Sequence, residues 1–185
     1  MKNFHLSTDI YFSDGALERL TQIKAKKAFI VTDPFMVNNG GIHAVTRPLG
    51  KGGTEWELFT DVVPDPPLEN VKEGVSRFEQ SGCDVIIGVG GGSAMDLAKA
   101  VRHIAEHMEN AEHIPLICIP TTSGTGSEVT SFAVISDTQK QVKIPLISEE
   151  MTPDEAILDA ILVRSVPASV TADTGMDVLT HAIEA

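Results

Sequence analysis

The sequence has few cysteines, few basic residues and no long hydrophobic run, and each shortage excludes a class of protein. Its two cysteines, Cys83 and Cys118, each adjoin an apolar run, which is typical of reduced core residues in a cytosolic protein rather than of a disulfide framework. Lys and Arg total 14 against 26 Asp and Glu, so the net charge of −12 argues against nucleic acid or an anionic membrane as a partner. No stretch of about 18 consecutive apolar residues occurs, and the N-terminus lacks the apolar core of a signal peptide. We therefore expect neither a membrane span nor secretion.

The residues that are present predict an α/β protein. A length of 185 residues with 42 % hydrophobic content is enough for one such domain. Short apolar runs bounded by turn residues predict strands at 4–12, 28–33, 54–59, 115–120 and 156–159. Amphipathic spacing predicts helices around 17–23 and 68–81, and a further helix is expected with Gly40 and Gly41 near its middle or start, leading past Pro48. Residues 132–147 are expected to form a β-hairpin appended to the parallel sheet.

Residues 85–99 predict a turn that binds phosphate. An apolar run typical of a buried strand is broken by three glycines at 90–92, and helical periodicity follows. Ser93 and Asp96 have the spacing of a capping box. Free N–H groups at a helix N-terminus attract anions, and glycines let a phosphate approach the backbone closely. The alternative is a tight turn without a ligand, since neither the P-loop nor the G-x-G-x-x-G spacing is present.

Two segments that follow predicted strands carry further candidate binding groups. Asp33 lies at the carboxyl end of the strand predicted at 28–33, where an acidic residue commonly holds the hydroxyls of an adenine ribose. A helix cap or turn before Pro34 is the alternative role for this carboxylate. Residues 121–128, Thr-Thr-Ser-Gly-Thr-Gly-Ser-Glu, follow another strand and offer many donors with little bulk. We interpret them as a second wall of the site, with a plain flexible loop as the alternative.

The helix after the glycine turn contains H-x-x-E-H at residues 103–107, the zinc signature of some metallopeptidases. This helix is expected to bury one stripe of side chains: Leu97, Val101, Ile104 and Met108. Lys99, His103 and His107 fall elsewhere on the helix. Because the strand, glycine turn and helix also do not match a peptidase, we interpret the histidines as part of a solvated helix face.

The end of the chain predicts two helices and half of a metal site. Pro167 opens the first helix, and residues 174–177 have the pattern of a capping box for the second. Asp177 and His181 are one helical turn apart, so they project from one face and can chelate a divalent metal. Two ligands are too few for a stable site, and a helix-surface pair is the alternative.

Taken together, these segments resemble the iron-containing (group III) alcohol dehydrogenases. The matching motifs occur in the family's order over essentially the whole chain: Gly90-Gly91-Gly92-Ser93-x-x-Asp96-x-x-Lys99, Pro120-Thr121-Thr122-x-Gly124-Thr125-Gly126-Ser127-Glu128, Ile157-Leu158-Asp159 and Gly175-Met176-Asp177-x-Leu179-Thr180-His181-Ala182-x-Glu184-Ala185. Residues 122–131 and 171–181 look most like the propanol dehydrogenases of propanediol-utilisation pathways. Ser13 and Ala160 depart from the family, which often has glycine and proline there, but neither touches the proposed chemistry.

The resemblance implies a domain division. Residues 1–166 would form a dinucleotide-binding domain, a Rossmann-like doubly wound parallel sheet. Residues 167–185 would be the truncated start of the family's all-helical metal-binding domain, whose remainder is absent from this chain. We therefore expect the 185 residues alone to bind NAD weakly, to hold no metal tightly and to be inactive.

The resemblance also implies a coenzyme site. The pyrophosphate would be held by Gly91, Gly92 and Ser93. The track from adenine to nicotinamide would be lined by Thr121, Thr122, Thr125, Thr130 and Lys143. Asp33 matches the position that faces the adenosine ribose, where a carboxylate accepts from the 2′-hydroxyl and repels a 2′-phosphate. NAD is therefore expected rather than NADP.

Asp177 and His181 match two of the family's four metal ligands, and the other two are histidines of the helical domain. Fe²⁺ is the metal that the resemblance implies, although Zn²⁺ also suits these ligands. No side chain is assigned as a general acid or base.

The implied function is NAD-dependent and metal-dependent interconversion of a small primary alcohol and its aldehyde by hydride transfer. We expect a homo-oligomer in the cytoplasm, with enclosure in a bacterial microcompartment left open, and no nucleic-acid or membrane partner. A polyol oxidoreductase similar to glycerol dehydrogenases and a nucleotide-binding module without chemistry are the alternatives. A phosphotransferase is disfavoured because the glycine turn has no lysine-serine continuation.

Overall fold

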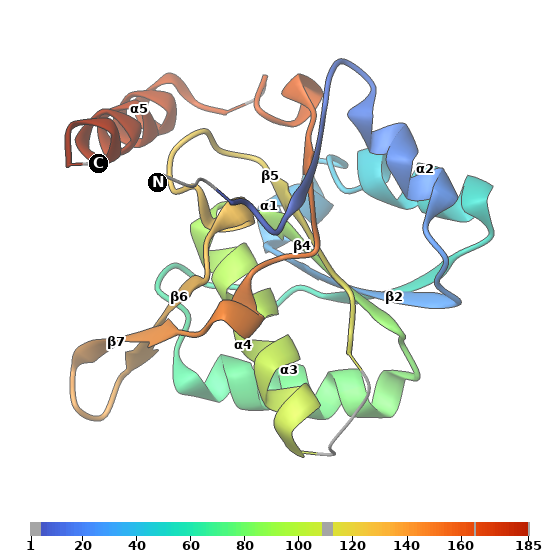
Figure 1. Ribbon diagram of the computed structural model, residues 1–185, viewed down its shortest axis with the longest axis horizontal. Coiled ribbons are helices and arrows are strands. Elements are labelled where there is room, and N and C mark those ends of the chain that lie inside the picture. The colour runs from blue at the N-terminus through green and yellow to red at the C-terminus, as the bar shows by residue number, and fades with distance from the viewer. Residues whose placement is uncertain (1–4, 109–112, 165, 185) are drawn as a thin grey trace.

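A six-stranded, all-parallel sheet forms the centre of the protein, with strands in the order β1-β8-β5-β4-β2-β3 (Figure 1). The computed structural model describes residues 5–108, 113–164 and 166–184. The strands of the sheet are β1 (Asp9–Phe12), β2 (Lys27–Thr32), β3 (Glu55–Phe59), β4 (Val85–Gly90), β5 (Leu116–Pro120) and β8 (Glu155–Leu158). The predicted α/β class and Rossmann-like sheet are confirmed.

The direction in which the chain adds strands reverses beside β2. This strand pairs with β3 on one side and with β4 on the other, so that Val31 lies opposite both Phe59 and Gly88. In open α/β sheets, ligands bind in the crevice at the carboxyl ends of the strands where such a reversal occurs. Asp33 follows β2 and Gly91 follows β4, so both lie at this crevice.

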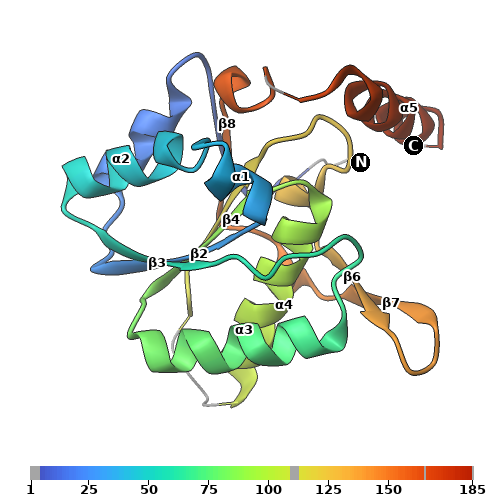
Figure 2. The same cartoon turned by 180° about the vertical axis from the view of Figure 1, so that it is seen from behind.

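Helices cover both faces of the sheet (Figure 2). One face is covered by the 3₁₀ helix η1 (Ala16–Gln22), α1 (Pro34–Asn38) and α2 (His43–Gly52), and the other by α3 (Leu68–Ser81) and α4 (Gly92–Met108). Strand β4 is buried along its whole length and serves both layers. Its Ile86 packs in the cluster of α3 and α4, whereas Ile87 packs in the cluster of η1 and α2. The continuous apolar run at residues 85–90 is thus explained by burial of β4 on both faces, as predicted.

The predicted hairpin is present as β6 (Phe132–Asp137) and β7 (Val142–Ile147), which form a separate antiparallel sheet. Short 3₁₀ helices connect the remaining parts: η2 (Ser127–Val129), η3 (Glu149–Met151) and η4 (Ala160–Leu162). The last element is α5 (Ala168–Glu184), which buries none of its residues completely. Within the described residues, no helix combines the length and the apolarity needed to cross a membrane.

The capping box predicted at the start of α4 is wrong. The Asp96 carboxylate does not bond back to the helix terminus. Its Oδ1 accepts from Ser127 Oγ at 2.6 Å and its Oδ2 accepts from the Val134 amide at 2.9 Å. Asp96 therefore makes long-range contacts, which join α4 to η2 and to the hairpin.

The predicted buried stripe of α4 is only partly correct. Met108 is 66 % exposed, because it lies at the end of the helix. Lys99, expected off the stripe, is fully buried. Its ammonium group donates to the carbonyls of Thr130 and Phe132, at 2.8 Å each, which compensates part of the cost of burying a charge.

Three further expectations about helices are only partly correct. Residues 168–184 form one continuous helix, because Thr174 Oγ1 donates to the Val170 carbonyl instead of capping a second helix. The glycines at 40–41 separate α1 from α2 instead of lying within one helix, and α2 continues through Pro48. The segment around 17–23 is the 3₁₀ helix η1, which ends before Ile23.

Candidate functional site

The glycine turn after β4 faces the loop formed by residues 121–128. Gly92 is the first residue of α4, so its N–H and that of Ser93 have no acceptor within the helix. A Cβ placed on Gly92 would lie 2.9 Å from Thr125 Cγ2, and one placed on Gly91 would lie 3.4 Å from Thr122 Oγ1. The absence of side chains on these glycines therefore lets the threonines of the loop approach the helix N-terminus closely.

A cavity beside this turn brings together several of the predicted site residues. Its polar lining comes from Asp33, Gly91, Thr121 and Thr122. Its apolar lining comes from Phe35, Met36, Leu162, Val166, Pro167 and Val170. The cavity thus has backbone and hydroxyl donors at the glycine turn and an apolar wall that extends to the first turn of α5. Such a mixture suits a ligand that carries both phosphate and flat rings.

The two alternative roles of Asp33 use different oxygens. Its Oδ1 accepts from the Met36 amide at 3.0 Å, which makes Asp33 the N-cap of α1. Its Oδ2 would lie 3.4 Å from a Cβ on Gly90, so this oxygen faces the glycine turn. No donor is recorded for Oδ2 among the described residues. The cap role is therefore real, and one oxygen is left for a ligand hydroxyl.

Thr130 and Lys143 do not line this cavity. The carbonyl and hydroxyl of Thr130 both accept from Lys99 Nζ, at 2.8 and 3.3 Å. Lys143 lies on β7, where its exposed Nζ pairs with Asp65 Oδ1 at 2.7 Å. The structure gives these two residues protein partners of their own, whereas the glycines, Ser93 and the threonines at 121, 122 and 125 gather around the turn.

Asp177 and His181 lie one turn apart on α5, with Oδ1 and Nε2 separated by 3.5 Å. A Cβ on Gly124 would lie 3.3 Å from Asp177 Oδ2, so this carboxylate faces the loop 121–128. A carboxylate oxygen and an imidazole nitrogen at this spacing suit Fe²⁺ or Zn²⁺. No third Asp, Glu, His or Cys of the described segments completes a group of three with them. The pair therefore fits half of a metal site.

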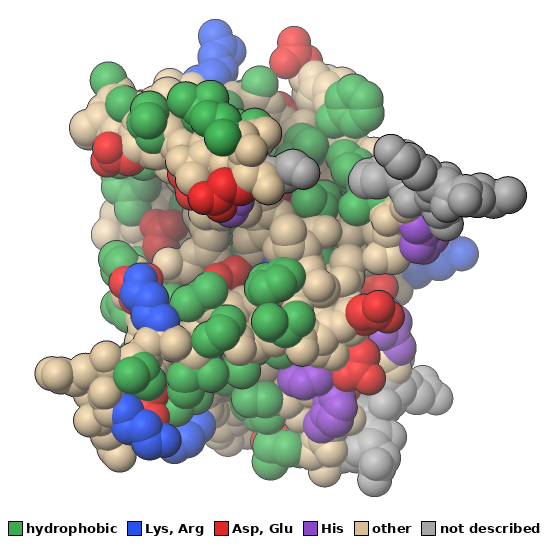
Figure 3. Space-filling model, turned by 60° about the vertical axis from the view of Figure 1, so that its left-hand side comes forward, with side chains coloured by type: hydrophobic (Ala, Val, Ile, Leu, Met, Phe, Trp, Pro, Cys, Tyr) green, Lys and Arg blue, Asp and Glu red, His purple; other side chains and the backbone are tan. Residues whose placement is uncertain are grey.

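A second cavity lies between the loop and the carboxyl ends of β1 and β8. Its lining includes Phe12, Thr122, Glu128, Leu158, Asp159 and Val178. Asp159 is fixed there by the amides of Leu17 and Ile161, which donate to its two oxygens at 3.3 and 3.2 Å. Figure 3 views the side of the molecule that carries α5 and the hairpin, and hydrophobic side chains are abundant on it. The large exposed apolar residues of α5 are Val170, Met176, Val178, Leu179 and Ile183.

Sequence reasoning missed two features near these cavities. Burial lowers the pKa of Lys99, an effect opposed by the nearby carboxylates of Asp96 and Glu128. Only its place in the glycine-turn motif could have pointed to it. The second feature is the neighbourhood of His103 and His107, which Glu150 joins from η3. The H-x-x-E-H spacing was the available signal for the histidines, but nothing local to it indicates Glu150.

Comparison of the sequence and of the fold with known proteins finds one family. A sequence model of iron-containing alcohol dehydrogenases matches residues 7–160. The chain is similar to the 1-propanol dehydrogenase PduQ of Citrobacter freundii, with 44 % identity over 185 residues, 100 % of this chain and 50 % of the relative. It is also similar to an NADPH-dependent butanol dehydrogenase of Clostridium saccharobutylicum, with 40 % identity over 200 residues, 100 % of this chain and 52 % of the relative.

Among solved structures, a sulfoacetaldehyde reductase from Bifidobacterium kashiwanohense in complex with NAD⁺ superposes with a TM-score of 0.89 at 32 % identity. The superposition covers 100 % of this chain and 53 % of that structure. The chain thus spans about half the length of the relatives that it matches.

Proposed function

Because the chain belongs to the iron-containing alcohol dehydrogenase family, we propose that it provides the dinucleotide-binding half of an enzyme that interconverts a small primary alcohol and its aldehyde. Residues 1–166 would be the coenzyme domain, and 167–185 would begin the metal-binding domain. The observation that carries the proposal is the crevice beside β2 and β4. There Asp33, the glycine turn and the 121–128 loop meet at the place where an α/β sheet binds nucleotides.

The glycine turn is proposed to hold the pyrophosphate. The amides of Gly92 and Ser93 point out of the helix N-terminus, where the helix dipole also favours an anion. Thr122 and Thr125 stand opposite these glycines and would fix the depth to which the phosphates enter. Thr121 would line the same track.

Thr130 and Lys143 are the less direct members of the proposed site. Lys143 could contact the coenzyme only after its ion pair with Asp65 breaks. This pair is exposed to solvent, so breaking it costs little free energy. Thr130 would act through its position next to Lys99.

Asp33 is proposed to select NAD over NADP. Its Oδ1 already caps α1, and its Oδ2 can accept a hydrogen bond from a ribose hydroxyl. A 2′-phosphate at the same place would meet a carboxylate at close range, which is unfavourable in a partly enclosed crevice. The relatives include an NADPH-dependent enzyme and an NAD⁺ complex, so the coenzyme has to be inferred from this residue.

Asp177 and His181 are proposed to hold part of the family's divalent metal, Fe²⁺ or Zn²⁺. When bound, the metal would stabilise negative charge on the substrate oxygen while the oxidised nicotinamide accepts a hydride from the alcohol carbon and the hydroxyl proton is released. The part played by this chain is positional. The side chain of Asp177 faces the 121–128 loop, whose threonines also face the glycine turn, so one loop would connect the coenzyme to the metal.

Coenzyme binding by the 185-residue chain tests the proposal directly. Calorimetric titration with NAD⁺ would compare the wild type with Gly92→Ala and with the matched control Gly175→Ala. The new methyl group at 92 would lie 2.9 Å from Thr125 Cγ2, so the loop or the helix N-terminus would have to move apart at the proposed pyrophosphate site, whereas a methyl group at 175 meets nothing within 4 Å. We expect Gly92→Ala to weaken binding at least tenfold, the equivalent of about 1.4 kcal/mol, and the control to leave it unchanged.

Turnover is tested separately. The chain would be joined to the helical half of its propanol dehydrogenase relative and assayed for NADH formation with short primary alcohols, beside the 185 residues alone. Activity of the fusion that is abolished by Asp177→Asn supports the assignment. Absence of NAD⁺ binding in the wild type, or equal binding by the two glycine variants, would refute the proposed coenzyme site.

A further inference from the structure

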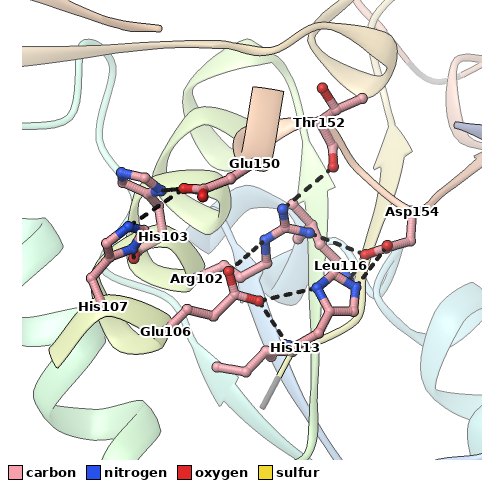
Figure 4. A network of polar contacts seen from close by, with 10 residues as sticks. Arg102, His103, Glu106, His107, His113, Leu116, Glu150, Thr152 and Asp154 are labelled. Carbon is pink, nitrogen blue, oxygen red and sulfur yellow. Dashed lines mark hydrogen bonds and ion pairs between the residues drawn. The ribbon is translucent and has the colours of Figure 1, made fainter. Parts of the chain in front are cut away.

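The histidines of the H-x-x-E-H sequence meet a carboxylate from a distant part of the chain. His103 and His107 are on α4, one helical turn apart, and Glu150 is on η3. Figure 4 shows both imidazole rings turned towards the Glu150 carboxylate. We propose that these three residues form a binding site for a borderline divalent metal, with Zn²⁺ as the representative ion. None of them lines the cavity at the glycine turn, so the inference does not depend on the proposed dehydrogenase activity.

The distances match those of a metal centre. His103 Nδ1 and His107 Nε2 each lie 3.4 Å from Glu150 Oε2, and all three ligand atoms lie within 4.8 Å of one another. In a tetrahedral zinc site with bonds of about 2.0–2.1 Å, neighbouring ligand atoms are about 3.3–3.4 Å apart. The two nitrogen–oxygen separations therefore have the length of two edges of such a tetrahedron, and they are longer than ordinary hydrogen bonds between these groups.

Hydrogen bonding prepares the two histidines as ligands. His107 Nδ1 lies 2.7 Å from the His103 carbonyl, which can only accept, so Nδ1 carries the proton in the neutral ring. The lone pair of the neutral ring is then on Nε2, the atom that faces Glu150. A backbone carbonyl that holds the remote nitrogen of a histidine is also the usual support of a metal ligand.

His103 offers the second nitrogen. Its Nδ1 is buried from solvent and has no hydrogen-bond partner among the described residues. An unpaired buried polar atom is costly, and a cation between the rings and the carboxylate would satisfy it.

Glu106, the acidic residue of the H-x-x-E-H pattern, is not part of the cluster. Its Oε1 accepts from the Ile114 amide at 2.7 Å and lies 3.3 Å from His113, and Oε2 lies 3.9 Å from Arg102 (Figure 4). It is thus held on another side of the helix and cannot act on a water at His103 and His107. The metallopeptidase interpretation fails for this reason, and the carboxylate ligand is supplied by η3 instead.

The donor set defines the class of metal. Two imidazoles and one carboxylate suit Zn²⁺, Co²⁺ or Ni²⁺, whereas Mg²⁺ and Ca²⁺ prefer oxygen ligands alone. The side chains of His107 and Glu150 are 57 % and 60 % exposed, so an ion can reach the site and keep water in the remaining position. A bound ion would join α4 to η3, the 3₁₀ helix that precedes β8.

Zinc titration of the 185-residue chain without a histidine tag tests the proposal. All measurements would be made in an Asp177→Asn, His181→Gln background, so that any binding by α5 is removed. We expect one Zn²⁺ per chain by calorimetry, an increase in melting temperature, and the visible absorption of four- or five-coordinate Co²⁺ when cobalt is used. Each of His103→Gln, His107→Gln and Glu150→Gln is expected to weaken binding at least about tenfold.

Two matched substitutions serve as controls. His113→Gln removes a histidine of the same surface, and His43→Gln removes an exposed histidine of α2, and neither should change the affinity. The Glu150 variant is the most informative because its side chain is exposed and its loss should not impair folding. Absence of Zn²⁺ binding in the background protein, or equal affinity in the three ligand variants and the controls, would overturn the proposal.

Discussion

Replacement of Asp96 by alanine is expected to loosen the wall of the coenzyme crevice. This carboxylate accepts from the Ser127 hydroxyl at 2.6 Å and from the Val134 amide at 2.9 Å, and so ties α4 to the end of the 121–128 loop and to the hairpin. It also opposes the effect of burial on the pKa of Lys99. Ser127 is only 4 % exposed, so alanine at position 96 would leave its buried hydroxyl without an acceptor.

The magnitude follows from the two hydrogen bonds. A hydrogen bond to a charged group contributes about 1.5–3 kcal/mol, so the loss of both gives a destabilisation of about 3–5 kcal/mol after some relaxation. For a domain of about this size each kcal/mol lowers the melting temperature by roughly 2–4 °C. Asp96→Ala should therefore melt about 6–20 °C below the wild type, and should bind NAD⁺ more weakly because Ser127 is part of the loop.

Asp96→Asn is the matched comparison. The amide oxygen can still accept from the Val134 N–H, and its NH₂ group can donate to the Ser127 oxygen, so both contacts survive without the charge. We expect this variant to lose less than half as much stability as the alanine variant. Urea denaturation followed by circular dichroism measures both. Equal destabilisation by Ala and Asn, or a loss below about 1 kcal/mol for Ala, would show that the two contacts do not hold the loop.

Three further predictions concern other parts of the chain. Asp33→Ser keeps a capping oxygen for α1 but removes the charge, so titrations with NAD⁺ and NADP⁺ should show a smaller preference for NAD⁺, and an unchanged ratio would contradict the ribose role. Burial raises the pKa of the Cys118 thiol to about 12 and also raises that of Cys83, so Ellman's reagent should label Cys118 only after unfolding; rapid labelling of Cys118 in the native chain would count against its burial. Hydrogen bonds, first from the backbone of the turn that follows it, lower the pKa of Asp137 below its ordinary 3.8, so its stabilising effect is present above that value and is lost as the pH falls through the folded pKa. The stability difference between wild type and Asp137→Asn should thus shrink in acid, and a difference that stays constant down to pH 2 would refute this.

The sheet could be predicted because its signals are local. Each central strand is buried on both faces and therefore has a continuous apolar run, as residues 85–90 show. The glycine turn was equally visible, since three consecutive glycines interrupt such a run before a helix begins. The partners of Asp96 could not be predicted, because Ser127 and Val134 are brought to it only by the folding of the loop and hairpin.

Side-chain patterns failed where tertiary contacts override local preference. The helical spacing of the apolar residues places Lys99 off the buried stripe, but the hairpin and loop cover it and two backbone carbonyls accept its hydrogen bonds. The capping-box pattern at 174–177 predicts two C-terminal helices, whereas Thr174 Oγ1 donates to the Val170 carbonyl within one continuous helix. The Asp33 and 121–128 predictions gained a common location from the structure, and their roles in coenzyme binding stay predictions.

The pairing of β1 with β8 has a consequence for the order of assembly during translation. Asp9 lies opposite Glu155, so β1 meets its partner only after the segments that form β2 to β5 have been synthesised. The four neighbouring strands can form a nucleus while this N-terminal segment is still without a neighbour. Until β8 is made, the unpaired β1 segment can pair with a wrong strand or bind a chaperone. A premature stop before residue 155 would release a polypeptide whose β1 segment has no neighbouring strand in the sheet.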